Sequence, residues 1–365
     1  MMQHKPTIAP RALGLAVLLA AAPAWAGNWI DRTQIHGFIT FQGSISDEPT
    51  YWLAPMDESG IARSGGLYGS RVGFNITSQV SERVDVVVQL MSRAEEQGFN
   101  THPDWAFVNV GLGEGLFLRV GKNKYPVGIV NEYVDVGTAY PWVKPPLAIY
   151  STNPEGPQAT RSAYQGALLG WSVTPGDGDW TFELDGYGGE VDLEHVKVKR
   201  VLGLTGKANW NDEVQFQLSA YQGQMNMDTS DPDMAAMSVM NGKTHSSVVG
   251  GVKVERGEWL LYAEAAQIRM DYTMGGRRAG DSDSWYVTVG RQFGDWLPHF
   301  TQQSWQRGNG NGHDISTLGL NYAMSPQVVW KGELNFVSTS GDGLYEGTPT
   351  GDSARVLTLA INVTF

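Results

Sequence analysis

The sequence predicts an all-β chain, a transmembrane antiparallel β-barrel of about 16 strands. Three observations support this prediction: apolar and polar residues alternate through most of the chain, short connections alternate with longer ones, and aromatic residues gather near the ends of the alternating segments. Closure follows from the chemistry of hydrocarbon, where every backbone N–H and C=O must be paired within the protein. A closed sheet satisfies that requirement because it has no edge.

The N-terminus has the order of parts found in a secretory signal peptide. Lys5 and Arg11 are followed by an apolar run over 12–22 and then by a small-x-small triplet. The run is too short for a helix across a hydrocarbon core of ~30 Å. We therefore expect residues 1–26 to be a cleaved signal peptide and residues 27–365 to form one barrel domain.

Composition and charge exclude several classes of protein. The chain has no cysteine, which excludes disulfide scaffolds, thiolate metal sites and cysteine nucleophiles. Its net charge is −12, and loss of the signal peptide removes two of the 26 bases and none of the 38 acids, which leaves −14. Such a chain lacks the basic surface of a nucleic-acid binder, so no nucleic-acid partner is expected.

Period-two alternation identifies the strands. In the last segment Leu357, Leu359 and Ile361 share one face, while Thr358 and Asn362 share the other. The apolar faces are expected to contact lipid and the polar faces to line a water-filled lumen. The sixteen predicted strands are 35–46, 68–80, 84–94, 104–111, 116–122, 162–173, 180–188, 200–210, 214–222, 245–255, 259–269, 284–293, 297–306, 315–324, 328–337 and 355–365.

The connections between these strands alternate in length. Seven short turns lie on one side of the sheet, and the longer loops on the other side are 47–67, 95–103, 123–161, 189–199, 223–244, 270–283, 307–314 and 338–354. An even-stranded barrel with short periplasmic turns and long extracellular loops predicts this arrangement. Segment 297–306 has the weakest alternation, so a barrel of fourteen strands is the alternative.

The longest loop carries two recognisable stretches, Gly121-Lys122-Asn123-Lys124-Tyr125-Pro126-Val127-Gly128 and Tyr140-Pro141-Trp142-Val143-Lys144-Pro145-Pro146. With the strand pattern, they make the mature chain resemble the Gram-negative general-diffusion porins of a proteobacterial branch along its whole length. The resemblance implies an outer-membrane homotrimer without a cofactor, whose third loop folds into the lumen. The terminal Phe365 resembles the insertion signal of outer-membrane proteins. The implied partners are the lipid bilayer, lipopolysaccharide and the barrel-assembly machinery.

Charged residues on the polar faces of the strands suggest where the pore narrows. Three arginines come from the second, third and fifth strands, and two acids lie in the third loop. If the loop folds inward, a basic wall faces an acidic loop across a narrow gap, which favours small polar solutes. The alternative is a plain solvated lining of paired charges. The predicted constriction residues are Arg71, Arg93, Arg119, Lys122, Glu132 and Asp135.

Four aromatic residues of the same loop allow two interpretations. Tyr125, Tyr133, Tyr140 and Trp142 could form a slide for sugars or aromatic acids, or they could pack the loop against the wall. We expect passive diffusion of small hydrophilic solutes and ions. A channel selective for a sugar, an aromatic acid or an organic acid is the alternative.

An excess of acids in the first, second and fifth loops bears on ion preference. A negative vestibule enriches cations within a Debye length of roughly 8 Å at physiological salt, so we expect a weak cation preference that fades as salt rises. The acids concerned are Asp47, Glu48, Asp57, Glu58, Glu95, Glu96, Asp228, Asp231 and Asp233.

No constellation for catalysis or metal binding is found in the sequence. The seven histidines form no i, i+4 pair, and the acidic fifth loop lacks the bidentate glutamate of a calcium loop. His195, with Asp192 and Glu194 nearby, is a faint likeness to barrel enzymes. A barrel enzyme or an adhesin is therefore the third and least favoured function, and neither a cofactor nor a metal is expected.

Overall fold

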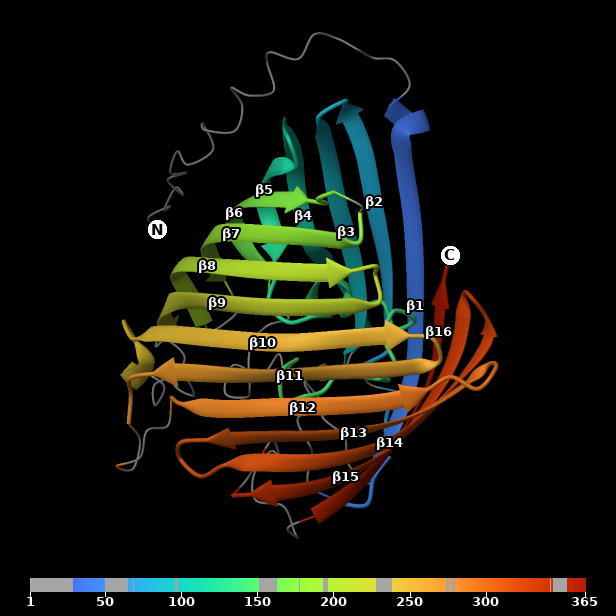
Figure 1. Ribbon diagram of the computed structural model, residues 1–365. Helices are drawn as coiled ribbons and strands as arrows, with labels where there is room; N and C mark the ends of the chain where they lie inside the picture. The colour runs from blue at the N-terminus through green and yellow to red at the C-terminus, as the bar shows by residue number, and fades with distance from the viewer. Residues whose placement is uncertain are drawn as a thin grey trace, which may run out of the picture.

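A computed structural model describes residues 29–49, 65–67, 69–95, 98–150, 163–176, 178–192, 196–227, 238–273, 276, 280–341, 343 and 353–365. Within these residues sixteen antiparallel strands close into one barrel (Figure 1). The predicted signal peptide lies outside the described residues. After the 3-10 turn η1 (Trp29–Arg32), the strands are β1 (Thr33–Ser46), β2 (Arg71–Ser81), β3 (Val84–Glu95), β4 (Gly98–Gly113), β5 (Leu116–Lys124), β6 (Ala163–Val173), β7 (Trp180–Asp192), β8 (Val196–Trp210), β9 (Val214–Met227), β10 (Thr244–Arg256), β11 (Trp259–Met270), β12 (Ser282–Arg291), β13 (Trp296–Arg307), β14 (Gly312–Ser325), β15 (Val328–Ser340) and β16 (Ser353–Thr364).

The barrel is closed by pairing of its first and last strands. β1 pairs with β16 in a register that places Phe41 beside Ile361. The terminal Phe365 extends this seam through two backbone hydrogen bonds with Gly37, of 2.7 and 2.9 Å. Its ring lies over Gly37, where any side chain would overlap it, and meets the edge of Phe74 at 6.1 Å. Gly37 therefore makes room for the last side chain of the chain.

The prediction of sixteen strands is confirmed, and the alternative of fourteen is wrong. The weakly patterned segment 297–306 forms β13, which pairs along its length with β12 and β14. Pairing between neighbouring strands satisfies the backbone N–H and C=O groups of this segment whether or not its side chains alternate cleanly.

Three strands run further than the alternation indicates, because β-bulges interrupt it. The register shifts between Gln89 and Leu90 where β3 pairs with β4, at 189–191 in β7, and at 199–202 in β8. A bulge adds one residue and so moves the following side chains to the opposite face. The long loops predicted at 95–103 and 189–199 are consequently mostly strand.

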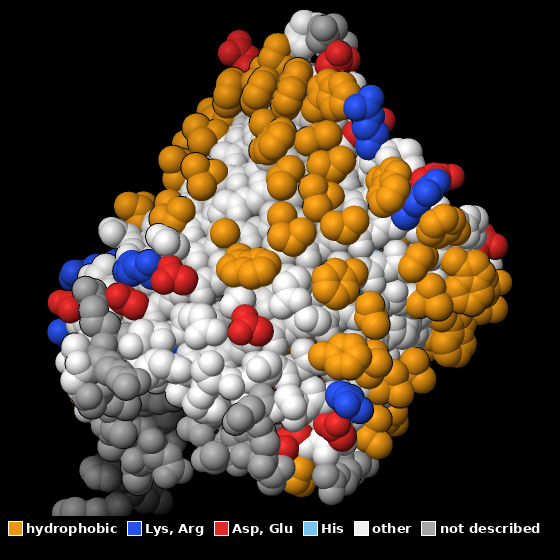
Figure 2. Space-filling model, turned by 60° about the horizontal axis from the view of Figure 1, so that its bottom comes forward, with side chains coloured by type: hydrophobic (Ala, Val, Ile, Leu, Met, Phe, Trp, Pro, Cys, Tyr) orange, Lys and Arg blue, Asp and Glu red, His pale blue; other side chains and the backbone are white. Residues whose placement is uncertain are grey.

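The outer wall is apolar and the inner wall is polar, as predicted. The outward side chains of Leu218 and Leu359 are 62% and 58% exposed, whereas the inward Thr358 and Asn362 are buried. Figure 2 shows hydrophobic side chains spread over one face of the wall, with charged side chains mainly at its margins. An outer surface of this kind suits lipid.

Tryptophans mark one rim of the barrel. Trp180, Trp259 and Trp296 are each the first residue of a strand that follows a short turn, and all three are exposed. Trp210, the last residue of β8, pairs in register with Trp180. Amphipathic rings prefer the headgroup level, so this rim lies at one membrane interface.

Candidate functional site: the third loop and the lumen wall

The third loop leaves β5 at Tyr125 and turns into the lumen, as predicted. Its described part, 125–150, includes the short 3-10 turn η2 (Asn131–Tyr133) and is largely buried. The Pro126 carbonyl accepts hydrogen bonds from inward side chains of β8 and β9, at 2.8 Å from Thr205 and 3.2 Å from Ser219. The polar face of the strands therefore holds the loop as well as facing water.

Glu264 on β11 fastens both ends of the loop to one place. Its carboxylate accepts hydrogen bonds from the backbone N–H of Ile129 at 2.8 Å and from the hydroxyl of Tyr150. Tyr286 on β12 donates to the same carboxylate at 2.6 Å. Burial, together with the Glu264 charge, raises the pKa of Tyr150 well above its ordinary value, so this hydroxyl remains a donor.

The second half of the loop is fastened to the opposite wall. Lys331 on β15 donates to the carbonyl oxygens of Gly137, Tyr140 and Trp142. Glu333, two residues further on, accepts from the Val143 N–H at 2.8 Å. At Gly137 the loop comes so close to the seam that a side chain would overlap Asn362. The loop therefore spans the lumen.

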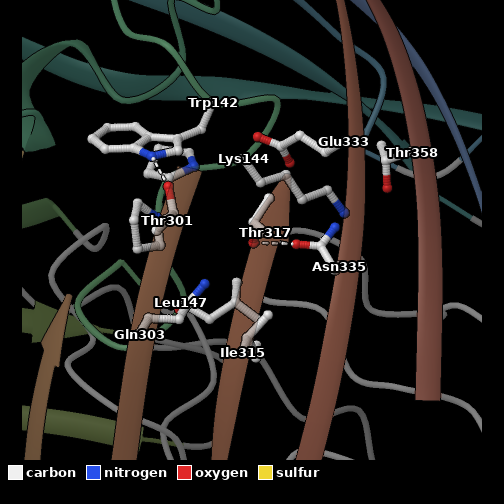
Figure 3. Close-up of a pocket in the computed structure, with 12 residues that line it drawn as sticks. Trp142, Lys144, Leu147, Thr301, Gln303, Ile315, Thr317, Glu333, Asn335 and Thr358 are labelled. Atoms are coloured by element: carbon white, nitrogen blue, oxygen red, sulfur yellow. Dashed lines mark hydrogen bonds between the residues drawn. The ribbon is translucent and has the colours of Figure 1, made fainter. Parts of the chain in front are cut away.

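Figure 3 shows this second half lying over the polar faces of β13 to β16. The Trp142 indole N–H donates to Thr288 at 2.9 Å and to Thr301 at 3.1 Å. Between Leu147 and Thr317 the loop and wall leave a cavity of about 30 Å³. That space accommodates no more than one or two water molecules, so the contact between loop and wall is close here.

The aromatic residues of the loop pack rather than present a slide. Tyr125, Tyr140 and Trp142 are 5%, 4% and 1% exposed, and Tyr133 packs against the same cluster. Tyr125 meets three wall tyrosines, at ring distances of 5.2 to 5.9 Å from Tyr164, Tyr187 and Tyr221. Of the two interpretations of these rings, the structure supports packing of the loop against the wall.

Asp135 occupies a buried cluster with basic residues of the wall. Its carboxylate lies 2.6 Å from the Lys124 ammonium and 3.2 Å from the Arg93 guanidinium, and both Asp135 and Lys124 are 1% exposed. Asp104 joins the cluster at 2.8 Å from Lys124. Arg71 donates to the Asp135 carbonyl at 2.8 Å and to the Tyr140 hydroxyl at 3.0 Å. These groups form a latch between the middle of the loop and β2 to β5.

Glu132 lies in a second charged group, and this one faces water. Its carboxylate is 2.9 Å from Lys207 on β8 and 3.6 Å from Arg119 on β5. Glu183 on β7 is 3.6 Å from Lys207. The side chains of Arg119, Glu132 and Glu183 are 31%, 36% and 41% exposed. Partial burial of Glu132 raises the pKa of its carboxyl group, but the positive charges of Lys207 and Arg119 lower that pKa by more. The net pKa is below its ordinary value, so the group is charged at neutral pH.

Two expectations about the constriction need correction. Arg93 and Asp135 touch, so no gap separates the acidic loop from this part of the basic wall. Lys122 lies three residues beyond Arg119 on β5 and therefore on the other face of the sheet. It pairs with the outward Ala106 and donates to the Pro103 carbonyl at 2.6 Å. Lys122 belongs to the outer wall and not to the lumen.

Sequence reasoning missed Lys124 and Asp104, which complete the latch. Both lie where a strand departs from simple alternation, Lys124 at the end of β5 and Asp104 at the bulge of β4. Of the acids predicted to charge the vestibule, Asp57, Glu58, Glu96, Asp228, Asp231 and Asp233 lie outside the described residues, as do His195 and Glu194. Asp47 and Glu48 are described, and Glu48 is buried.

Two further searches bear on the site. Across the described ranges, no three His, Asp or Glu side chains gather as metal ligands would. In the same part of the chain, no helix has the length and apolar character needed to cross a membrane.

Comparison of the fold with solved structures is decisive about architecture. An anion-selective porin from Comamonas acidovorans superposes with a TM-score of 0.61 at 14% identity, over 91% of this chain and 99% of that one. The chain has the porin fold. OmpF of Salmonella typhi, solved with daunomycin, superposes with a TM-score of 0.60 at 14% identity, over 91% of this chain and 97% of that one. The outer-membrane channel DcaP of Acinetobacter baumannii superposes with a TM-score of 0.53 at 10% identity, over 91% of this chain and 97% of that one. No family model and no curated protein matches the sequence.

Proposed function

We propose that this porin-fold chain is a passive channel for small hydrophilic solutes and ions in the outer membrane of a Gram-negative bacterium. The observation that carries the proposal is the contrast between a lipid-compatible outer wall and a lumen with water-facing charges at Arg119, Glu132 and Glu183. The structures it resembles include porins and an outer-membrane channel. With its loop fastened to opposite walls, the channel passes less current than an open lumen of sixteen strands would.

The same contrast divides the charged residues by role. Side chains that water reaches can interact with a passing ion, whereas the buried Asp135 and Lys124 hold the loop. We therefore propose Arg119, Glu132, Glu183 and Lys207 as the charges that set ion preference. A selective aromatic slide is not proposed, since those rings are buried, and no enzymatic function is proposed.

Ion preference in planar bilayers tests these roles. Glu132→Gln removes one water-facing carboxylate, so the reversal potential in a salt gradient should shift toward anions. Arg119→Gln should shift it toward cations, and the wild type should be weakly cation-preferring at low salt. Arg269→Gln serves as a control, because Arg269 lies on the outward face of β11, where it pairs with Asp283 at 2.7 Å, and does not line the lumen. Unchanged potentials in both test variants would contradict the assignment, and absence of conductance would contradict the channel itself.

We further propose a homotrimer that packs through the seam. Phe41 and Leu359 lie there and are 55% and 58% exposed, and one structure of the same fold is described as a trimer form. Phe41→Ser combined with Leu359→Ser should convert a trimeric mass into a monomeric one in native mass spectrometry. The matched change of Leu184 and Phe182, on the opposite wall, should leave the trimer intact. A monomeric wild type would end this proposal. Recognition of Phe365 by the barrel-assembly machinery remains a prediction.

A further inference from the structure

Four methionine side chains gather on the inner face of the wall, at the end of the barrel that carries the longer connections (Figure 1). Met225 and Met227 end β9, Met270 ends β11, and Met240 lies in the connection that leads into β10. All four belong to one buried cluster and are 4–8% exposed. Four thioether sulfurs are therefore held in one apolar space near the mouth of the lumen.

Methionine is also concentrated in this part of the sequence. The chain has 12 methionines, and two of them, Met1 and Met2, lie in the predicted signal peptide. Of the other ten, seven fall between residues 225 and 274. Met91 on β3 and Met324 on β14 are described and lie outside the cluster. The gathering of sulfur in space thus follows a gathering in sequence.

Apolar packing alone does not explain the choice of methionine. Where the third loop packs on β13 to β16, the buried cluster of described residues consists of leucine, isoleucine, valine, alanine and tryptophan. Strands generally favour β-branched and aromatic residues, and methionine normally serves as an occasional gap filler in a core. Four methionines in one cluster supply something that these other side chains lack, which is sulfur.

The backbone holds three of the methionines in place. Met225 and Met227 are two residues apart on β9, so both side chains lie on its inward face. The Met225 N–H donates to the Lys243 carbonyl at 2.9 Å, and the Met227 N–H donates to the Asn241 side chain at 2.5 Å. The connection before β10 is thereby folded back on β9, and it brings Met240 to the two strand methionines.

Met270 reaches the same space from the other side of β10. This strand lies between β9 and β11 in the sheet. Neighbouring strands are about 4.8 Å apart, so roughly 10 Å separates the backbones of β9 and β11. Methionine is long and unbranched and has three rotatable bonds, so side chains from the two strands can meet above β10. The cluster therefore surrounds its centre from two strands and one connection.

The donor atoms indicate which ligand this arrangement suits. Thioether sulfur is soft and uncharged, and it favours soft ions such as Cu(I). Hard cations such as Ca²⁺ and Mg²⁺ require carboxylate, carbonyl or water oxygens and gain little from it. The absence of a cluster of His, Asp or Glu among the described residues concerns nitrogen and oxygen donors only. A site made of sulfur selects an ion by its softness.

We propose that the methionine cluster binds one soft monovalent metal ion, Cu(I) or its chemical analogue Ag(I), through the thioethers of Met225, Met227, Met240 and Met270. Uncharged ligands in an apolar space match an ion of low charge, because burying a higher charge without a compensating anion is costly. The proposal concerns the folded chain and does not depend on conduction, so its failure would leave the proposed channel function untouched.

Calorimetric titration of Ag(I) into the full chain, refolded in detergent and free of chloride, tests the proposal. The wild type should bind one ion per chain. Met225→Leu and Met270→Leu should each weaken binding at least about tenfold, as loss of a supporting group does in metal sites. Leucine preserves volume and apolar character, so each variant should fold. Met91→Leu is the matched control, because Met91 is equally buried but lies on β3, and its affinity should equal that of the wild type.

Replacement of all four cluster methionines by leucine gives the second test. This variant should retain no Cu(I) after desalting without oxygen, whereas X-ray absorption of the loaded wild type should show a first shell of sulfur. Excess Ca²⁺ should not displace Ag(I) from the wild type. Equal Ag(I) affinity in the wild type and the single variants would overturn the proposal. A first shell of nitrogen and oxygen would overturn it as well, as would an equal loss of affinity in Met91→Leu.

Discussion

The substitution Asp135→Asn should release the middle of the third loop and increase the current through each channel. The carboxylate is buried between Lys124 and Arg93, and its loss leaves these two cations to share the single carboxylate of Asp104. Removing one partner of a buried ion pair costs about 3–5 kcal/mol. That cost falls on the latched state of the loop, because a released loop lets water reach Lys124 and Arg93. Single-channel recordings of Asp135→Asn should therefore show larger conductance and more frequent transitions between levels.

Glu132→Gln is the matched control for this change. It removes a carboxylate of the same loop three residues earlier, but one that is 36% exposed and faces water. Water and salt compensate for its partners, so ion preference should change without extra transitions between conductance levels. If Asp135→Asn gave the conductance and noise of the wild type, the latch would not control the position of the loop.

Arginine at Leu218 should destabilise the barrel by about 2–4 kcal/mol. Leu218 is 62% exposed on the outward face of β9, and its place near the middle of the crossing puts the new charge in hydrocarbon. The free energy of unfolding in lipid vesicles, from urea titration, measures the cost.

Gln215→Arg is the control, because Gln215 is inward on the same strand, only partly buried, and makes one side-chain hydrogen bond, to Gln217. Gln217 is unsuitable because it also donates to the Pro126 carbonyl that holds the loop. Equal losses in both variants would show that the two faces are misassigned.

The sequence by itself predicted the strands and their faces. Period-two alternation follows from the geometry of a strand, so each segment carries its own information about which side chains meet lipid. The strand ends predicted from alternation were wrong in β4, β7 and β8. Bulges at or beside Asp104, Gly189 and Arg200 shift the side chains there by one position. A bulge has no strong local pattern, since it depends on how two strands fit together.

The inward fold of the third loop also followed from sequence, through its length and its resemblance to known loops. The contacts that the loop makes with the wall could not be predicted from the sequence. Asp135 and Glu132 are three residues apart and chemically alike, yet one is buried in a latch and the other faces water. That difference depends on wall residues up to 194 positions away in the chain, such as Lys331 bonded to Gly137. Contacts of this range are fixed only when the barrel closes, because closure brings strands distant in sequence to the same lumen.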